Sequence, residues 1–466
     1  MKQPVARNPS SFVHADHIRA MFSRELSAMY SAEVPKYATL LKLVAKVNVQ
    51  AQDRSEPICG NQRPNGQHNR LGIERHGAIR LGSAEELKEI RRLFAVMGMS
   101  PTGYYDLSAA GMPVHATAFR PTNDLSLQCN PLRIFTSLLR VELIQDAGLR
   151  ATIERILSAR QILTSRCREL IERFEVEGGL SESAAREFVT EALQAFCWRG
   201  EATVNVNVYR ALKSVHPLIA DVVCFKGPHI NHLTPRVLDI DKAHEEMRKL
   251  GLQVKETIEG PPKRKVPILL RQTSFLAQEE PIHFAGAEEK GTHTARFGEI
   301  EQRGCALTPK GRALYDTLLS STLLDVRKRA QDARQYSEVL AHNFRTFPDE
   351  VRRLHHEKLA YFRYSVNEDH VRLHGYPPTE ASIDALVDAG WILIEPQVYE
   401  DFLPVSAAGI FQSNLNGQKG QIFAADANRT AFEEALDTKV VNEFELYEAV
   451  EIESLEACME QVRAKC

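Results

Sequence analysis

The sequence contains ERHGAIRLGSAEELKEIRRLFAVMGM at 74–99 and PHINHLTPRVLDIDKAHEEMRKLG at 228–251, two stretches that share one layout. Each begins with a short strand-like run that carries a histidine, His76 or His232. Seven residues later comes a serine or aspartate of the helix N-cap type, and an amphipathic helical pattern follows it. Further strand-like runs come next, so each stretch predicts a βαβββ module. The two stretches share the order of their predicted elements more than their amino-acid identities, so the sequence leaves open whether the modules arose by duplication.

Helical patterns surround these two modules. They cover the first fifty residues and the acidic segment from about residue 430. The other helical patterns lie at 131–146, 151–175, 181–197 and 308–320. In the last of these, Thr308 is the expected N-cap and Pro309 the first helical residue.

We expect five regions along the chain. They are an N-terminal helical region (1–73), a first βαβββ module (74–125), a helical insertion (126–217), a second module that carries metal ligands (218–306), and a region of C-terminal helices and strands (307–466). The expected fold class is α+β, in which the modules form a barrel and additional helices surround it.

Composition excludes several classes of partner. Lys and Arg number 58 against 61 Asp and Glu, a net charge of −3 that predicts no nucleic-acid or anionic-membrane partner. No apolar run is long enough to predict a transmembrane helix. The first residues, MKQPVARNPSSFVHADH, lack the apolar core of a secretory signal, so we expect a cytoplasmic protein. The oligomeric state is not predicted.

The eight cysteines are scattered and contain no C-x-x-C pair. This pattern fits neither a zinc site nor a disulfide framework, and it predicts reduced thiols packed as small apolar residues. A metal ion would therefore need histidine and carboxylate ligands.

Such a ligand set is available in His76, His232 and Glu299. Two imidazoles and one carboxylate on one face of the metal form the ligand set of non-haem Fe(II) oxygenases. The two histidines take equivalent places in the two modules, and the glutamate lies in the closing strand of the second. Alternatives remain open, because Glu301 shares a strand face with Glu299. The other candidate ligands nearby are His115, His229 and His293.

Arg80 and the segment 404–409 are candidates for binding an anion. Arg80 follows His76 by four residues and would lie on the same side of an extended strand. A guanidinium grips a carboxylate bidentately, which suits an anionic substrate held at its other end by the metal, although a structural ion pair would explain Arg80 equally. The small residues of PVSAAG (404–409) allow either an anion-binding nest or a plain tight turn.

Several longer strings make the chain recognisable. They are ERHGAIRLG (74–82), FAVMGM (94–99), GYYDLS (103–108), PVHATAFRP (113–121), PHINHLTPR (228–236), EGPPKR (259–264), PILLRQTSF (267–275), GTHTARFGEIEQRGCALTPKGRALYD (291–316) and YEDFLPVSAAGIFQSNL (399–415). With these strings the chain resembles the bacterial 2-oxoadipate dioxygenase/decarboxylases, also called 2-hydroxyglutarate synthases. The resemblance covers roughly residues 12–415, but not 51–73 or the tail beyond 418.

The resemblance implies a vicinal-oxygen-chelate fold, an Fe(II) cofactor and a reaction. The family converts 2-oxoadipate and O₂ to (R)-2-hydroxyglutarate and CO₂ in lysine catabolism, so a 2-oxo diacid and O₂ are the implied partners. FGEIEQR (297–303) also resembles the closing strand of 4-hydroxyphenylpyruvate dioxygenases, which places the acidic ligand at Glu299 rather than at Glu301. The implied iron ligands are His76, His232 and Glu299, and the implied substrate contacts are His76, Arg80, His232 and the backbone at Val405 and Ser406.

Two other classes of function remain as alternatives. Barrels of this kind also host zinc or nickel isomerases and extradiol-type dioxygenases. The second alternative is a non-enzymatic binding protein.

Overall fold

The computed structural model describes residues 12–54, 70–108, 111–277, 279–286, 290–294, 296–329, 333–377, 381–403 and 425–464. The first module starts with β1 (Arg75–Leu81), and α4 (Ala84–Val96) follows at once. Ser83 caps α4 by accepting a hydrogen bond from the Glu86 backbone N–H, and the Glu86 carboxylate accepts one from the Gly82 N–H at 2.8 Å. This reciprocal cap turns the chain sharply from strand into helix.

Three more strands complete the first module. They are β2 (Ser100–Asp106), β3 (Val114–Arg120) and β4 (Leu132–Leu139), with α5 (Asp124–Cys129) between the last two. The strand order is β2-β3-β4-β1, in which β4 runs parallel to β1 and antiparallel to β3.

The helix predicted at 131–146 is wrong, because 132–139 form β4 and a single 3₁₀ turn follows at Val141–Leu143. Every residue of β4 is buried, so the strand lacks the alternation of apolar and polar residues that marks a half-exposed strand. Such an apolar run cannot be told from a buried helix by its periodicity. β4 also lies beyond residue 125, where the first module was predicted to end.

The second module repeats the same layout in a more fragmentary form. Its elements are β5 (His232–Pro235), α11 (Ile240–Lys249), β6 (Leu270–Ser274) and β9 (Glu299–Arg303), with a hairpin of β7 (Glu279–His283) and β8 (Lys290–Thr294) inserted before β9. β6 pairs antiparallel with β9. A parallel bridge joins Arg236, just after β5, to Glu301 on β9. This corresponds to the parallel pairing of β1 with β4 in the first module. The strand-like run at 252–259 makes only single bridges, from Val254 to Phe275 just after β6 and from Glu259 to Gln272 of β6.

The two modules meet where β1 and β5 pair antiparallel, with Ala78 opposite His232. The predicted barrel is not found: the strands of the described residues form one open five-stranded sheet, β2-β3-β4-β1-β5, and three two-stranded sheets, and they close no ring. One reason lies at the β2 edge, where Thr102 bridges Val441 and the Gly103 N–H donates to the Val441 carbonyl at 2.9 Å. The chain near the C-terminus therefore covers an edge that barrel closure would need.

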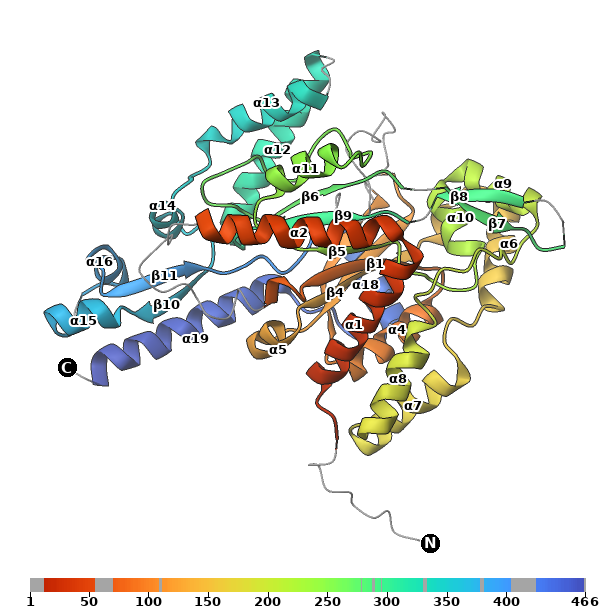
Figure 1. The fold of residues 1–466 in the computed structure, drawn as a ribbon, viewed down its shortest axis with the longest axis horizontal. Helices are drawn as coiled ribbons and strands as arrows, with labels where there is room; N and C mark the ends of the chain where they lie inside the picture. The colour runs from red at the N-terminus through yellow and green to blue at the C-terminus, as the bar shows by residue number, and fades with distance from the viewer. Residues whose placement is uncertain are drawn as a thin grey trace, which may run out of the picture.

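The sheet separates two hydrophobic cores. Ile79 and Leu81 of β1 pack in the core that also contains the helices α1 (Ala15–Glu33) and α2 (Pro35–Arg54), which confirm the predicted N-terminal helices. Figure 1 shows both helices crossing the sheet on one side. Ala78 of β1 and Phe135 of β4 face the other core. Side chains at even positions of β1 therefore point into the second core.

The remaining helices pack in both of these cores. After β4 come α6 (Ala147–Ser158), α7 (Ser165–Glu177), α8 (Glu182–Leu193), α9 (Val206–Val215) and α10 (Pro217–Val223). After β9 come α12 (Pro309–Arg329), α13 (Ala333–Asn343), the turn Phe344–Thr346, α14 (Val351–His356), β10 (Phe362–Val366), α15 (Glu368–His374), α16 (Ile383–Asp388), β11 (Ile392–Pro396), α18 (Ala425–Leu436) and α19 (Glu443–Ala464). The Thr308 hydroxyl accepts from the Gly311 N–H at 3.1 Å, so the predicted start of α12 is confirmed.

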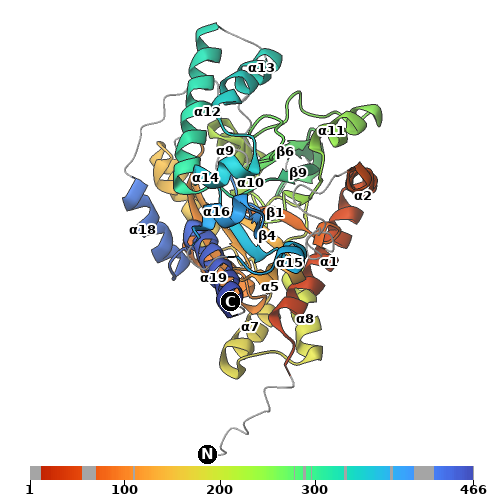
Figure 2. The ribbon, with the colours of Figure 1, turned by 90° about the vertical axis from the view of Figure 1, so that its left-hand side faces the viewer.

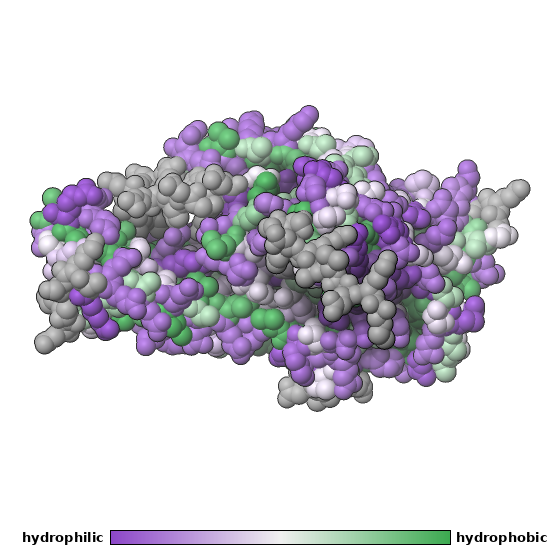
Figure 3. Space-filling view, turned by 90° about the horizontal axis from the view of Figure 1, so that it is seen from below, coloured by the Kyte–Doolittle hydropathy of each residue, from purple (hydrophilic) through white to green (hydrophobic). Residues whose placement is uncertain are grey.

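The C-terminal elements pack together beside the sheet. β10 and β11 form an antiparallel pair, and α19 runs along β10 (Figure 1). Figure 2 shows α14, α15, α16 and α19 grouped on the side that faces the viewer. On the face drawn in Figure 3, hydrophilic residues predominate and hydrophobic ones lie in small separate groups. Among the described helices, none is both long enough and apolar enough for a membrane crossing.

Candidate metal centre

Three short strands bring His76, His232 and Glu299 together. His76 is the second residue of β1, His232 begins β5, and Glu299 begins β9. The antiparallel register of β1 and β5 sets His232 opposite Ala78, so the two imidazoles point to the same face of the sheet. Ile300 packs in the opposite core, which leaves Glu299 on the face of the histidines.

The three side chains form a compact buried triangle. His76 Nε2 lies 3.1 Å from Glu299 Oε2, His232 Nε2 lies 3.6 Å from the same oxygen, and the two Nε2 atoms are 3.3 Å apart. All three residues are at most 3% exposed. Ligands that bond one metal ion at about 2.1 Å in adjacent positions lie about 3 to 3.5 Å from one another. The donor set and its spacing therefore fit one face of a metal ion's coordination shell.

Neighbouring side chains orient His76 and Glu299, whereas the Nδ1 atom of His232 has no hydrogen-bond partner among the described residues. His76 Nδ1 is 2.8 Å from Glu301 Oε2, and the Arg303 guanidinium donates to the other Glu301 oxygen at 2.9 Å. A proton on Nδ1 would leave Nε2 free to bind a metal. Glu299 Oε2 accepts from the Thr234 hydroxyl at 3.0 Å and from the Gln272 amide at 2.9 Å. The two glutamates of β9 thus take different positions, one at the triangle and one behind His76.

Burial and charge set the protonation of the site. Burial lowers the pKa of His232 to about 4, although Glu299 opposes this shift. Burial also disfavours the charged form of His76, but Glu301 and Glu299 outweigh it and raise the His76 pKa. Burial alone would raise the pKa of Glu299, yet the two histidines lower it. Without a metal these shifts favour the ionised form of Glu299, the neutral form of His232 and the protonated form of His76, whose extra proton a divalent cation would displace.

Arg80 shares a small cavity with His232. The cavity has a volume of about 10 Å³, and its lining is Ala78, Ile79, Arg80, Val114, Phe135, Ser137, Leu218 and His232. Arg80 Nη1 donates to Asp221 Oδ2 at 2.5 Å, so the ion pair weighed as an alternative does exist. A guanidinium has five N–H donors, and one such bond leaves others for a ligand. The pair and a substrate contact are therefore compatible.

Asp221 of α10 is a buried carboxylate that the sequence did not reveal. Its Oδ1 lies 3.0 Å from His293 Nε2 and 3.3 Å from His229 Nε2, and the Asn231 amide donates to Oδ2 at 3.3 Å. Both of these histidines were candidate metal ligands, and the structure places them around Asp221 instead. The third candidate, His115 of β3, packs against Tyr104 and Phe432.

Phe402 closes the site from the C-terminal side. Its ring packs against the His76 ring with centroids 5.1 Å apart and against Phe135 at 5.4 Å, and it is fully buried. The Arg303 guanidinium lies over the same ring at 5.3 Å. Sequence analysis missed this contact, although the string YEDFL (399–403) contains it. Val405 and Ser406, the predicted backbone contacts, lie just beyond, outside the described residues.

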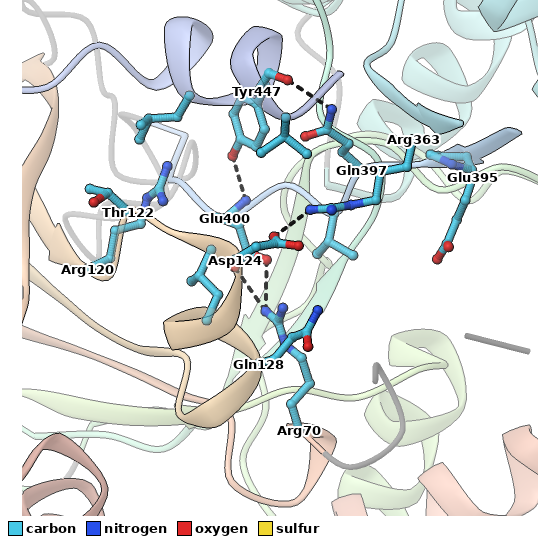
Figure 4. Close-up of a pocket in the computed structure, with 15 residues that line it drawn as sticks. Arg70, Arg120, Thr122, Asp124, Gln128, Arg363, Glu395, Gln397, Glu400 and Tyr447 are labelled. Carbon is cyan, nitrogen blue, oxygen red and sulfur yellow. Dashed lines mark hydrogen bonds and ion pairs between the residues drawn. The ribbon is translucent and has the colours of Figure 1, made fainter. Parts of the chain in front are cut away.

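A buried network of charges supports the same end of the sheet. Arg133, the register partner of His76, pairs with Glu74 and with Glu400, and Arg70 also binds Glu400. A cavity of about 140 Å³ lies beside Arg70, Glu400 and Tyr447 (Figure 4). None of the three triangle residues lines it. This larger cavity is therefore separate from the candidate metal centre.

Comparison with known proteins identifies the family. The family described as 2-oxoadipate dioxygenase/decarboxylase matches residues 22–414 of this chain. The chain belongs to this family. Among proteins of that name, the one from Escherichia coli K12 is 52% identical over 455 residues, covering 96% of this chain and 98% of the relative. The one from Mycobacterium tuberculosis H37Rv is 38% identical over 419 residues, covering 87% and 89%.

A solved structure of a 2-oxoadipate dioxygenase/decarboxylase relative has the same fold. The hydroxyglutarate synthase from Pseudomonas putida, crystallised in complex with 2-oxoadipate, superposes with a TM-score of 0.89 at 50% sequence identity. The match covers 97% of this chain and 99% of that one. The α+β class predicted from sequence is thus confirmed, and the family match extends across both modules.

Proposed function

We propose that this chain is an Fe(II)-dependent enzyme that converts 2-oxoadipate and O₂ to (R)-2-hydroxyglutarate and CO₂. The observation that carries the proposal is the buried His76, His232 and Glu299 triangle in a chain that matches a 2-oxoadipate-bound relative along nearly its whole length. The proposed physiological setting, lysine catabolism, rests on the family resemblance alone.

The three triangle residues would hold the metal. Fe(II) bound there would act as a Lewis acid toward a 2-oxo acid that chelates it, and would supply the redox chemistry that O₂ activation needs. Glu301 would keep the proton of His76 on Nδ1, because its carboxylate lies 2.8 Å from that atom. A metal with two neutral imidazoles and one carboxylate keeps a net positive charge, which favours an anionic substrate.

We assign the far carboxylate of the substrate to Arg80. A six-carbon diacid held by the metal at one end must place a second carboxylate in a nearly dry pocket, and an unpaired charge there is costly. Arg80 lies two residues beyond Ala78, the register partner of His232, and it lines the same cavity as His232. The present cavity holds about one water molecule, so binding requires neighbouring side chains to move. Backbone contacts from Val405 and Ser406 remain a prediction.

The reaction balances without a second 2-oxo acid. The bond between C1 and C2 of 2-oxoadipate breaks and releases CO₂, while the two atoms of O₂ supply the new carboxylate oxygen and the new hydroxyl oxygen. Phe402 and Phe135 would keep water away from the reacting end, since both rings are buried, Phe402 against His76 and Phe135 against Phe402. The chain's own residues thus bind, orient and desolvate.

We also infer that the paired modules represent a vicinal-oxygen-chelate architecture. The parallel contacts of β1 with β4 and of β5 with β9, together with the antiparallel junction of β1 and β5, support this assignment. The ligands come from the first strand of each module and the last strand of the second.

The decisive experiment is anaerobic loading with Fe(II), followed by 2-oxoadipate and O₂. We expect one CO₂ and one (R)-2-hydroxyglutarate per O₂ consumed, identified by mass spectrometry and chiral chromatography, and no turnover with Zn²⁺ or Ni²⁺. An isomerase would consume no O₂, and an extradiol dioxygenase would require a catechol as its substrate. A binding protein would convert neither 2-oxoadipate nor a catechol. Any of these three results would overturn the proposal.

A further inference from the structure

We propose that His355, His356 and Asp384 form a second metal site, which binds Zn²⁺ or a similar divalent transition ion and ties α14 to α16. The two histidines end α14, and the aspartate lies in the first turn of α16. These helices belong to the C-terminal group, apart from the strands that carry the candidate iron ligands (Figure 1). The inference does not depend on the proposed function.

The ligand atoms have the spacing of a metal site. Asp384 Oδ1 lies 3.5 Å from His355 Nδ1 and 3.8 Å from His356 Nδ1, and one ligand atom from each residue lies within 4.8 Å of the others. Neither ring nitrogen is close enough for a good hydrogen bond to this oxygen. Tetrahedral bonds of about 2.0 to 2.1 Å to zinc place neighbouring ligand atoms about 3.4 Å apart. The distances between these three atoms therefore suit a bound metal ion better than direct hydrogen bonds between the side chains.

The opposite ring nitrogens are already occupied. His355 Nε2 is 3.0 Å from the Tyr364 hydroxyl, and His356 Nε2 is 3.2 Å from Asp388 Oδ1. Histidines that bind metal usually have the other ring nitrogen held by a carboxylate or another polar group. Both rings are thus oriented with Nδ1 toward Asp384.

His355 provides the strongest indication of a missing ligand. It is only 7% exposed, and its Nδ1 has no hydrogen-bond partner in the part of the chain that the structure describes. A buried polar atom without a partner costs about 1 to 3 kcal/mol, and a bound cation would remove that cost. Burial also lowers the pKa of His355, which favours the neutral form that binds metal.

The donor set defines the class of ion. Two imidazoles and one carboxylate, with a fourth position open to water, suit Zn²⁺, and Co²⁺ and Ni²⁺ are its common substitutes. The side chains of His356 and Asp384 are 38% and 60% exposed, so the ion can enter directly from solvent. Because the ligands come from two helices, a bound ion would stabilise their packing across β10 and β11.

The test counts metal ions on the full-length chain. Metal-free protein is dialysed against Zn²⁺ and separately against Co²⁺, and bound metal is measured by mass spectrometry, with thermal unfolding as a second readout. We expect two ions per wild-type chain and one in His356→Ala and in Asp384→Asn, with at least tenfold weaker binding at the lost site. His76→Ala should also retain one ion, at the α14–α16 site. Zn²⁺ should raise the melting temperature of His76→Ala but not that of His76→Ala combined with Asp384→Asn.

Both single variants alter partly exposed side chains, so the fold should persist. His342→Ala on α13, which changes another exposed histidine, is the matched control and should keep two ions. The proposal is wrong if His356→Ala and Asp384→Asn keep the wild-type metal count. It is equally wrong if His76→Ala binds no ion at all.

Discussion

At the scale of single residues, Glu299 and Glu301 divide two tasks on one face of β9. Glu299 lies close to both imidazoles, whereas Glu301 contacts one imidazole, that of His76, at Nδ1. We predict that Glu299→Gln no longer retains Fe(II) after loading, because a neutral amide is a poor ligand for Fe(II). Glu301→Gln should keep its iron with an affinity lower by about 10 to 100-fold. Iron per chain after gel filtration measures both effects, and the reverse order would make Glu301 the ligand.

The protonation of His76 predicts how metal affinity depends on pH. Its pKa is raised, so in the metal-free chain the stabilising ion pairs of His76 are present below the ordinary histidine pKa and are lost as pH rises through the raised value. A metal must displace this proton, so affinity should increase about tenfold per pH unit below the raised pKa and level off above it. Calorimetry in buffers of different ionisation enthalpy counts the protons released. Glu301→Gln should shift this levelling to lower pH; an unchanged profile would contradict the assignment.

Arg80 and Asp221 together should determine selectivity for a diacid. Loss of a buried charged hydrogen-bond pair costs about 2 to 5 kcal/mol, so Arg80→Met should lower kcat/KM for 2-oxoadipate by about thirty-fold to several-thousand-fold, while iron binding stays near normal. Anaerobic binding of 2-oxoadipate and of the six-carbon 2-oxo monoacid gives the selectivity without turnover. If Arg80 contacts the far carboxylate, only diacid binding should weaken.

Asp221→Asn tests whether the buried carboxylate acts through Arg80. It should reduce the preference for the diacid in the wild-type background, because Asp221 fixes one edge of the guanidinium. In the Arg80→Met background the same change should have no further effect on that preference. Additive losses would mean that Asp221 has a separate structural role.

Much of this site could be predicted from the sequence, because the spacing that marks the two histidines lies within short segments of the chain. His76 and His232 stand at matched positions before two helix caps, and both lie near the start of their strands, β1 and β5. The contacts of Phe402 and Asp221 join residues that are far apart in the chain, and no periodicity marks them. Only the fold reveals which distant side chains meet.

At the scale of elements, Gly77 permits the close approach of β1 and β5. A Cβ at this position would lie 2.5 Å from Ile230 Cδ1 and 3.1 Å from the His232 carbonyl oxygen. We predict that Gly77→Ala destabilises the protein by about 1 to 3 kcal/mol and weakens metal binding, because the strand that carries His232 must shift. Urea unfolding and metal titration measure the two effects. Gly72→Ala, whose Cβ would have no atom within 4 Å, is the control and should change neither.

The helices whose first turn has a recognisable N-cap residue were predicted best. The caps at Ser83 and Thr308 mark where α4 and α12 begin, because a cap is a local hydrogen bond. β4 was mistaken for a helix, because its burial on both faces removes the alternation that identifies a strand. The open sheet was not predictable from either module, since it depends on Val441 reaching the β2 edge from far along the chain.

At the scale of the whole molecule, α19 supports the metal centre from the C-terminal side. The Tyr447 hydroxyl donates to Asp401 Oδ2 at 2.6 Å and accepts from the Glu400 N–H at 2.7 Å, and the next residue, Phe402, packs on His76. The acidic tail, which fell outside the recognised resemblance, is thus part of the fold that holds the site.

Tyr447→Phe should therefore affect both stability and the site. It leaves the Glu400 N–H and one Asp401 oxygen without this partner, a loss of about 1 to 3 kcal/mol. We expect a lower melting temperature and weaker metal binding. Tyr361→Phe removes the hydroxyl of the ring stacked on Tyr447, which contacts neither carboxylate residue, and it is the matched control. Equal effects of the two variants would refute a specific role for Tyr447.

The antiparallel junction of β1 and β5 also has a consequence for folding kinetics. It brings together His76 and His232, which are 156 residues apart, and His76 also meets Glu301 across 225 residues. Contacts of such large sequence separation form late, because long loops must close before the contacts stabilise them. A metal ion that needs all three strands can bind only after both halves have docked. The rate of metal uptake during refolding would thus report the rate at which the last long-range contacts form. It would do so in the full-length chain without any introduced label.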